Sequence, residues 1–141
     1  MPTTYTLIIY FLSLFIVSSC ASKKNESFDH PHEEAETDWK EMDAFHLVMA
    51  ETFHPYKDSS NLEPAKSRAA ELMDAADRWA SAELPAKVDN PELKEKLQQL
   101  KSQTATLAGS VRTADDDMIA EQLTQVHDTF HEIQEAWYGG H

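Results

Sequence analysis

The residues of this chain best suited to chemistry are its seven histidines, which are unevenly spread. They are His30, His32, His46, His54, His127, His131 and His141. Side chains four residues apart lie on one face of an α-helix, about 6 Å apart, so His127 and His131 can reach one metal ion. The eight-residue spacing of His46 and His54 is about 12 Å along a helix, too far for two ligands of one ion. The sequence therefore indicates a metal site that starts from His127 and His131.

The apolar pattern predicts the first two of the helices that would position these histidines. The first helix begins near Asp38 and should end near His54, because proline disfavours helix at the residue before it. The second begins near Pro64 and stops before Pro85. Their apolar stripes are Met42, His46, Met49 and Phe53 in the first, and Ala65, Ala69, Leu72, Ala76 and Trp79 in the second.

The remaining pattern predicts two more helices. The third has Asn90 as its N-cap and Pro91 as its first residue. The fourth follows a capping box of Thr113 and Asp116. Their stripes are Leu93, Leu97, Leu100, Thr104, Leu107 and Val111 in the third, and Ile119, Leu123, Val126, Phe130, Ile133 and Trp137 in the fourth.

Four helices with short connectors and no strand-like alternation predict an all-α fold, an antiparallel up-down-up-down four-helix bundle. The first and fourth helices are then antiparallel neighbours. Met42 should lie level with His131, and His46 roughly level with His127. We therefore predict that Met42, His46, His127 and His131 bind one transition metal.

The predicted ligand set indicates which metal it would bind. Imidazole together with thioether suits copper best, whereas imidazole alone also accepts zinc or nickel. Glu132 and Glu135 are nearby carboxylates that complete the ligand shell or orient an imidazole.

The same residues also have an interpretation without metal. The histidines of the fourth helix would then be exposed residues at the boundary of its apolar stripe, and Met42 would be a core residue. His54, before a proline, is interpreted as a residue that caps a helix end. The three tryptophans are interpreted as core residues near helix ends.

The beginning of the chain predicts export and a lipid anchor. The apolar stretch from Leu7 to Val17 is shorter than the roughly 20 residues of a permanent membrane span, but it suits the apolar region of a signal peptide. Val17-Ser18-Ser19-Cys20 resembles a bacterial lipobox, and the resemblance implies that Cys20 is lipidated and begins the mature protein. A plain secretory signal and an uncleaved anchor are the alternatives.

This interpretation divides the chain into four parts. Residues 1–19 are a lipoprotein signal peptide, 20–37 a lipidated flexible tether, 38–138 the bundle and 139–141 a tail. The expected location is the cell envelope, facing the periplasm. Ala21 stands where some inner-membrane lipoproteins have an aspartate, which favours the outer membrane.

Composition and motifs narrow the function. The 12 Lys and Arg and the 25 Asp and Glu, a net charge of −13, all follow Cys20 and argue against a nucleic-acid partner, because phosphate binding needs a basic surface. The chain contains no nucleophile elbow, phosphate-binding glycine loop or HExxH motif, so we expect no enzymatic activity. The expected partners are the membrane, through the lipid, and a metal ion.

The segment from Gln122 to His131 resembles the last helix of cytochrome b562, in which an axial histidine follows an aromatic residue. The resemblance implies His131 and Met42 as axial ligands of haem b in an electron carrier. A rival register, that of cytochrome c′, makes His127 the axial residue. The two thiols that attach c-type haem are absent, so covalent haem is excluded. The candidate functions are thus metal buffering, sensing or delivery, haem-based electron transfer, and a cofactor-free interaction or scaffold lipoprotein.

Overall fold

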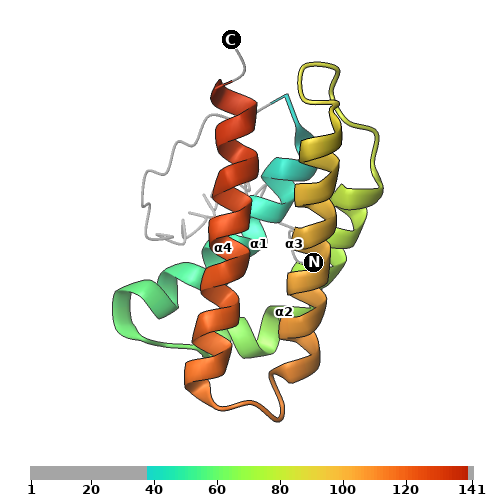
Figure 1. Cartoon of the computed structure of the whole chain (residues 1–141). Helices are drawn as coiled ribbons and strands as arrows, with labels where there is room; N and C mark the ends of the chain where they lie inside the picture. Colours follow the sequence, from blue (N-terminus) through green and yellow to red (C-terminus); the bar gives the residue numbers. More distant parts are fainter. Residues whose placement is uncertain (1–37, 140–141) are drawn as a thin grey trace, which may run out of the picture. The chain divides into compact units, whose positions relative to one another are not determined.

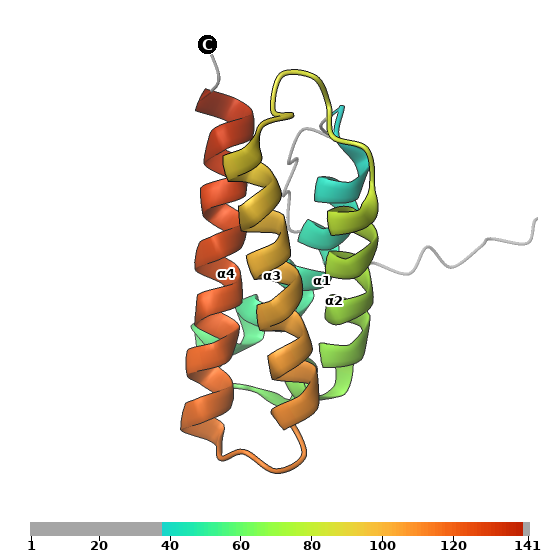
Figure 2. The ribbon, with the colours of Figure 1, turned by 45° about the vertical axis from the view of Figure 1, so that its right-hand side comes forward.

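The computed structural model describes residues 38–139, which form four α-helices and no strand. The helices are α1 (Lys40–Ser59), α2 (Glu63–Ser81), α3 (Pro91–Ser110) and α4 (Asp116–Gly139). Each helix packs against the next along the chain, and α1 also packs against α4 (Figure 1). The turned view in Figure 2 shows the same arrangement, with the α2–α3 and α3–α4 connectors at opposite ends of the helices. The prediction of an all-α fold with four packed helices is confirmed for these residues.

The N-terminus of α3 is capped as predicted. The side-chain oxygen of Asn90 accepts the backbone N–H of Leu93 at 2.9 Å. Pro91 occupies the first helical position, where a backbone N–H has no intrahelical partner to lose. The local sequence alone was sufficient to predict this helix start.

The N-terminus of α4 is capped differently from the prediction. The carboxylate of Asp115 accepts the backbone N–H of Met118 at 2.9 Å. The hydroxyl of Thr113 instead donates to the carbonyl oxygen of Ser110, at the end of α3. The predicted capping box of Thr113 and Asp116 is therefore wrong, because Asp115 is the residue that directly precedes the helix and meets its free N–H groups.

The C-terminus of α1 also differs from the prediction, which ended this helix near His54. The helix continues through Pro55 to Ser59, and Ser60 closes it in a left-handed conformation with its N–H donating to Tyr56 at 2.7 Å. Proline inside a helix removes one backbone hydrogen bond. Here the hydroxyl of Ser59 donates to the carbonyl of Pro55 at 2.8 Å, and Tyr56 packs against the core. His54 is therefore part of the helix body and does not cap it.

The predicted apolar stripes form the core. Every stripe position predicted for α2 and α4 is buried, as are the first five predicted for α3. In α1, Met42, Met49 and Phe53 are buried, whereas His46 is half-buried. Phe45, which the stripe did not include, is also fully buried. The core is therefore predicted well in α2 to α4 and less completely in α1.

Three tryptophans pack together at one end of the helices. The rings of Trp39 and Trp79 lie 5.1 Å apart edge to face, and those of Trp39 and Trp137 lie 5.2 Å apart. The ammonium of Lys87, from the α2–α3 connector, lies 3.3 Å from the centre of the Trp137 ring, a cation–π contact. Because Trp39 precedes α1 and Trp137 is near the end of α4, the start of α1 and the end of α4 lie together.

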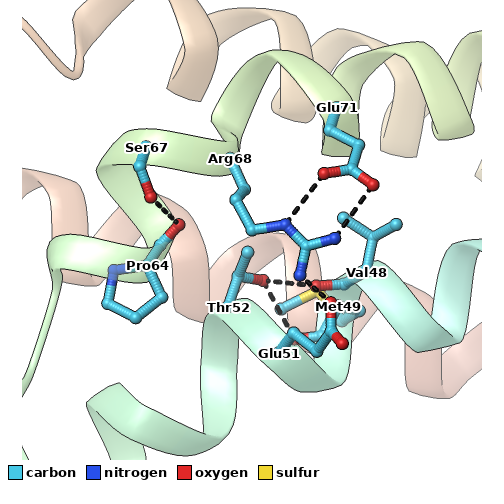
Figure 3. Close-up of polar contacts among 8 residues, drawn as sticks. All are labelled: Val48, Met49, Glu51, Thr52, Pro64, Ser67, Arg68 and Glu71. Atoms are coloured by element: carbon cyan, nitrogen blue, oxygen red, sulfur yellow. Dashed lines mark hydrogen bonds and ion pairs between the residues drawn. The ribbon is translucent and has the colours of Figure 1, made fainter.

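Polar contacts join α1 to α2 (Figure 3). The guanidinium of Arg68 donates to both carboxylate oxygens of Glu71, at 2.8 and 2.9 Å, and also pairs with Glu51 on α1. Nearby, the buried hydroxyl of Thr52 donates to the carbonyl of Met49 at 2.9 Å. Of these contacts, the ion pair of Arg68 with Glu51 joins the two helices, and the other two stabilise α2 and α1 internally.

Several predictions concern residues outside this range. The signal peptide, the tether, the lipidated Cys20 and the last tail residues lie outside the described residues, and so do His30, His32 and His141. Of the helices described between residues 38 and 139, none has the length and apolar character needed to cross a membrane.

Candidate metal centre

Aromatic rings fill the seam between α1 and α4. Phe45 of α1 lies 5.5 Å from Phe130 of α4, measured between ring centres, and His46 stacks on the same Phe130 ring at 5.1 Å. Further along the seam, Phe53 of α1 stacks on His127 of α4 at 3.7 Å, with the ring planes 10° apart. Both histidines are therefore positioned by a phenylalanine from the opposite helix.

His127 and His131 meet on successive turns of α4. Their Nε2 atoms are 3.0 Å apart, their ring centres are 4.4 Å apart, and the ring planes are inclined by 70°. The side chain of His127 is half-buried, and that of His131 is exposed. The structure therefore brings these two predicted ligands together, with the pair reaching the solvent through His131.

The distance between the two Nε2 atoms bears on what the pair can bind. Two nitrogens about 2.0–2.1 Å from one ion lie about 2.9 Å apart at a right angle, as in tetragonal copper(II), and about 3.3 Å apart in tetrahedral zinc. The observed 3.0 Å lies between these two values. The same distance also suits a hydrogen bond between a donor ring and an acceptor ring. The hydrogen bond needs one neutral imidazole, and binding of one ion by both rings needs two.

The surroundings of His127 favour its neutral form. Burial lowers the pKa of His127 below its usual range, and the positive charge of His131 lowers that pKa further. Asp128, with a carboxylate oxygen 3.5 Å from Nδ1 of His127, acts in the opposite direction. A protonated His54 on α1 also contributes to the lower pKa. Because metal binds the neutral imidazole, His127 is held in the form that a ligand needs.

The ligands predicted on α1 are Met42 and His46. Met42 is only 1 % exposed and belongs to the core. The ring that contacts His127 is Phe53, seven residues after His46, which itself contacts Phe130. Helical side chains tilt toward the N-terminus of their own helix, so in antiparallel helices the tips that meet come from later residues than those whose backbones are level. The contacts across the seam are therefore shifted from the expected pairing of His46 with His127.

The two carboxylates expected beside the site face another helix. Glu132 forms an ion pair with Lys96 of α3, and this hydrogen bond raises the pKa of Lys96. Glu132 and Glu135 both line a cavity of about 340 Å³ between α3 and α4. Glu132 thus contacts α3, whereas His127 contacts α1.

Phe53, which stacks on His127, and His54, the residue after it, were not among the ligands predicted from the sequence. Phe53 was identified only as an apolar position, and His54 only as a helix end. Both had a signal, because Phe53 closes the apolar stripe of α1 and His54 follows it directly. Across residues 38–139, no group of three or more His, Cys, Asp or Glu is already arranged to hold a metal ion.

Comparison with protein-family models, with curated proteins and with solved structures found no match. The histidine pair, the phenylalanine stacked on it and its charged neighbours are therefore the observations that bear on function.

Proposed function

We propose that this protein is a lipid-anchored four-helix bundle of the cell envelope that binds a transition metal, preferably copper, for metal buffering, sensing or delivery. The observation that carries the proposal is the 3.0 Å separation between the Nε2 atoms of His127 and His131. The lowered pKa of His127 adds support, because it favours the neutral ring. Copper is preferred because imidazole together with thioether suits it best among the transition metals.

Further ligands come from α1 or from solvent. Met42 and His46 are the candidates that the sequence provides. His46 is half-buried at the same seam. Met42 is 1 % exposed, so its thioether reaches an ion only if the rings of the seam repack.

We infer that the helices run up, down, up and down in the bundle. The connectors are short, which favours antiparallel neighbours. The packing of Trp39 on Trp137 at 5.2 Å supports an antiparallel pairing of α1 and α4, because it joins the start of one helix to the end of the other.

The proposed location rests on the start of the sequence. An apolar stretch followed by Val17-Ser18-Ser19-Cys20 supports lipidation of Cys20. Ala21, in place of an aspartate, favours the outer membrane, with the bundle facing the periplasm. The proposed partners are the membrane, through the lipid, and the metal ion. The net charge of −13 supports the exclusion of nucleic acid.

Haem b, ligated by Met42 and His131, is the alternative implied by the resemblance to cytochrome b562. Met42 is 1 % exposed and packed in the core, so a porphyrin ligated by it needs the core at that level to open. An ion that starts from His127 and His131 does not need this change, which makes the metal ion the better-supported proposal. A cofactor-free scaffold is the third possibility.

Metal binding can be tested with the purified protein. Cu²⁺ that binds only the folded state should stabilise it by about 2.7 kcal/mol at a free concentration of 100 times Kd. His127→Ala and His131→Ala should each remove most of this gain, whereas Gln125→Ala, on an exposed part of the same helix, should not. A Soret band in the visible spectrum of the protein as isolated would identify haem instead. If the protein shows no Soret band and no metal-dependent stabilisation, the scaffold interpretation is the one that remains.

A further inference from the structure

A cavity of about 280 Å³ lies between α1 and α2 and shares no residue with the histidine pair of α4. It is formed where the start of α1 meets the end of α2, which lie beside each other in Figure 2 and are joined by the contact of Trp39 with Trp79. Its lining residues are Lys40, Glu41 and Ala44 from α1, and Ala75, Arg78 and Trp79 from α2.

The inner wall of this cavity is apolar. Trp79 and Ala75 are buried and belong to the core. Ala44 is exposed on the facing helix, and its single methyl group leaves space that a larger side chain would fill. Pockets for drug-sized ligands begin at about 300 Å³. The cavity therefore suits a smaller ligand, with one ring or a short carbon chain.

Arg78 supplies the charge of the cavity that no other side chain neutralises by contact. Among the described residues, none forms a hydrogen bond or ion pair with Arg78, whose charge acts on Glu71 only at longer range. The other two charges of the lining pair with each other, because Nζ of Lys40 lies 3.5 Å from a carboxylate oxygen of Glu41. An exposed guanidinium is therefore available to an anion at the apolar wall.

We propose that this cavity binds a small carboxylate that carries an apolar group, such as an aromatic ring. The guanidinium of Arg78 presents its N–H donors in a planar fork that matches the two oxygens of a carboxylate. The apolar part of the ligand lies against the ring of Trp79 and the methyl groups of Ala44 and Ala75. A purely polar anion would leave this wall unused, so the combination favours a ligand with both parts.

The indole N–H of Trp79 provides a probe of the cavity. It is buried and has no hydrogen-bond acceptor within the part of the chain that the structure describes, although buried polar groups normally have a partner. A bound carboxylate brings acceptor oxygens into the cavity that this tryptophan lines. The magnetic resonance signal of this N–H therefore reports whether a ligand enters.

The test uses benzoate as the probe. It is titrated into the isotope-labelled full chain, and the backbone and indole N–H signals are followed by nuclear magnetic resonance. The signals of Arg78 and Trp79 should shift and reach saturation. Acetate lacks the ring and benzamide lacks the charge, so each should bind at least about tenfold more weakly than benzoate. The absence of saturable shifts, or equal affinity for the three probes, would overturn the proposal.

Two exposed positions of the cavity allow variants that leave the core intact. Arg78→Gln removes the guanidinium and should weaken benzoate binding at least about tenfold. Ala44→Phe fills the cavity and should abolish binding. Ala105→Phe makes the same change on an exposed part of α3 and should leave binding unchanged. Equal binding by the two phenylalanine variants would exclude this cavity as the site.

A purely structural role of Arg78 gives a different result. Arg78 lies in the last turn of α2, where a positive charge stabilises the helix end. If that were its only role, Arg78→Gln would lower the melting temperature and leave the affinity for benzoate unchanged, which refutes the proposal. Weaker binding by a variant that retains the signal pattern of the folded wild type supports it, and this variant decides the question even if Ala44→Phe does not fold.

Discussion

The packing of α3 can be tested by removing one buried leucine. Leu100 is 0 % exposed and lies in the apolar stripe of that helix. Truncation to alanine loses about 0.8 kcal/mol for each buried CH₂ equivalent and leaves a cavity, so Leu100→Ala should cost about 3 kcal/mol or more. For a domain of about 100 residues, this corresponds to a melting temperature lower by roughly 12–24 °C. Thermal unfolding followed by circular dichroism measures the change.

Leu47 provides a matched control for this truncation. It is a leucine in the middle of α1 but is 70 % exposed. Leu47→Ala makes the same chemical change without opening a cavity and should alter the free energy of unfolding by no more than about 0.5 kcal/mol. If the two variants differ by less than about 1 kcal/mol, within twice that surface range, Leu100 is not a core residue and the packing argument is refuted.

Four further changes test other parts of the molecule. Arg68→Ala should cost about 1 kcal/mol or less in chemical unfolding, because the ion pairs that it breaks are partly exposed; a loss above 3 kcal/mol would contradict this. Asn90→Ala should cost about 1 kcal/mol through loss of the N-cap, and an unchanged midpoint would exclude that role. Cys20→Ser should block lipidation, and a variant that is still processed and recovered with membranes would refute the lipobox. Without metal, the unfolded chain binds a proton at residue 127 more readily than the fold, because the pKa of His127 is lowered in the fold. The free energy of unfolding should therefore fall as pH drops through about 6.5 toward the lowered pKa, and His127→Gln should reduce that slope.

Local sequence signals predicted most of the helices because each signal acts within one turn. Asn90 with Pro91 marks the start of α3, and the stripe of α4 is buried at every predicted position. Pro55 was misleading because proline disfavours helix at the preceding residue without excluding it. The helix nevertheless continues to Ser59, and Tyr56, the residue after the proline, packs against the core. This packing is a tertiary contact, which a rule about the residue before a proline does not include.

The candidate site was predictable only in part. The four-residue spacing of His127 and His131 places both rings on one face of α4, and helix geometry alone is enough to predict this. The partner across the seam depends on how rings from two helices interleave. Phe53 is long enough to reach His127, and the resulting contact displaces the pairing that level backbones would predict. The contact of Phe53 with His127 therefore depends on packing between two helices, which the spacing within one helix does not predict.

The arrangement of the pair is asymmetric, and this asymmetry matters for binding an ion. One face of His127 is covered by Phe53, so its ring is fixed, partly desolvated and biased toward the neutral form. His131 is exposed and free of that stacking contact, so it can adjust its ring to the ion. A fixed ligand beside an adjustable one lowers the ordering cost of binding, since only the exposed ring has rotamers to lose. In the proposed site, the ring of His127 is thus fixed in advance by Phe53, and His131 stays open to the solvent from which the ion would approach.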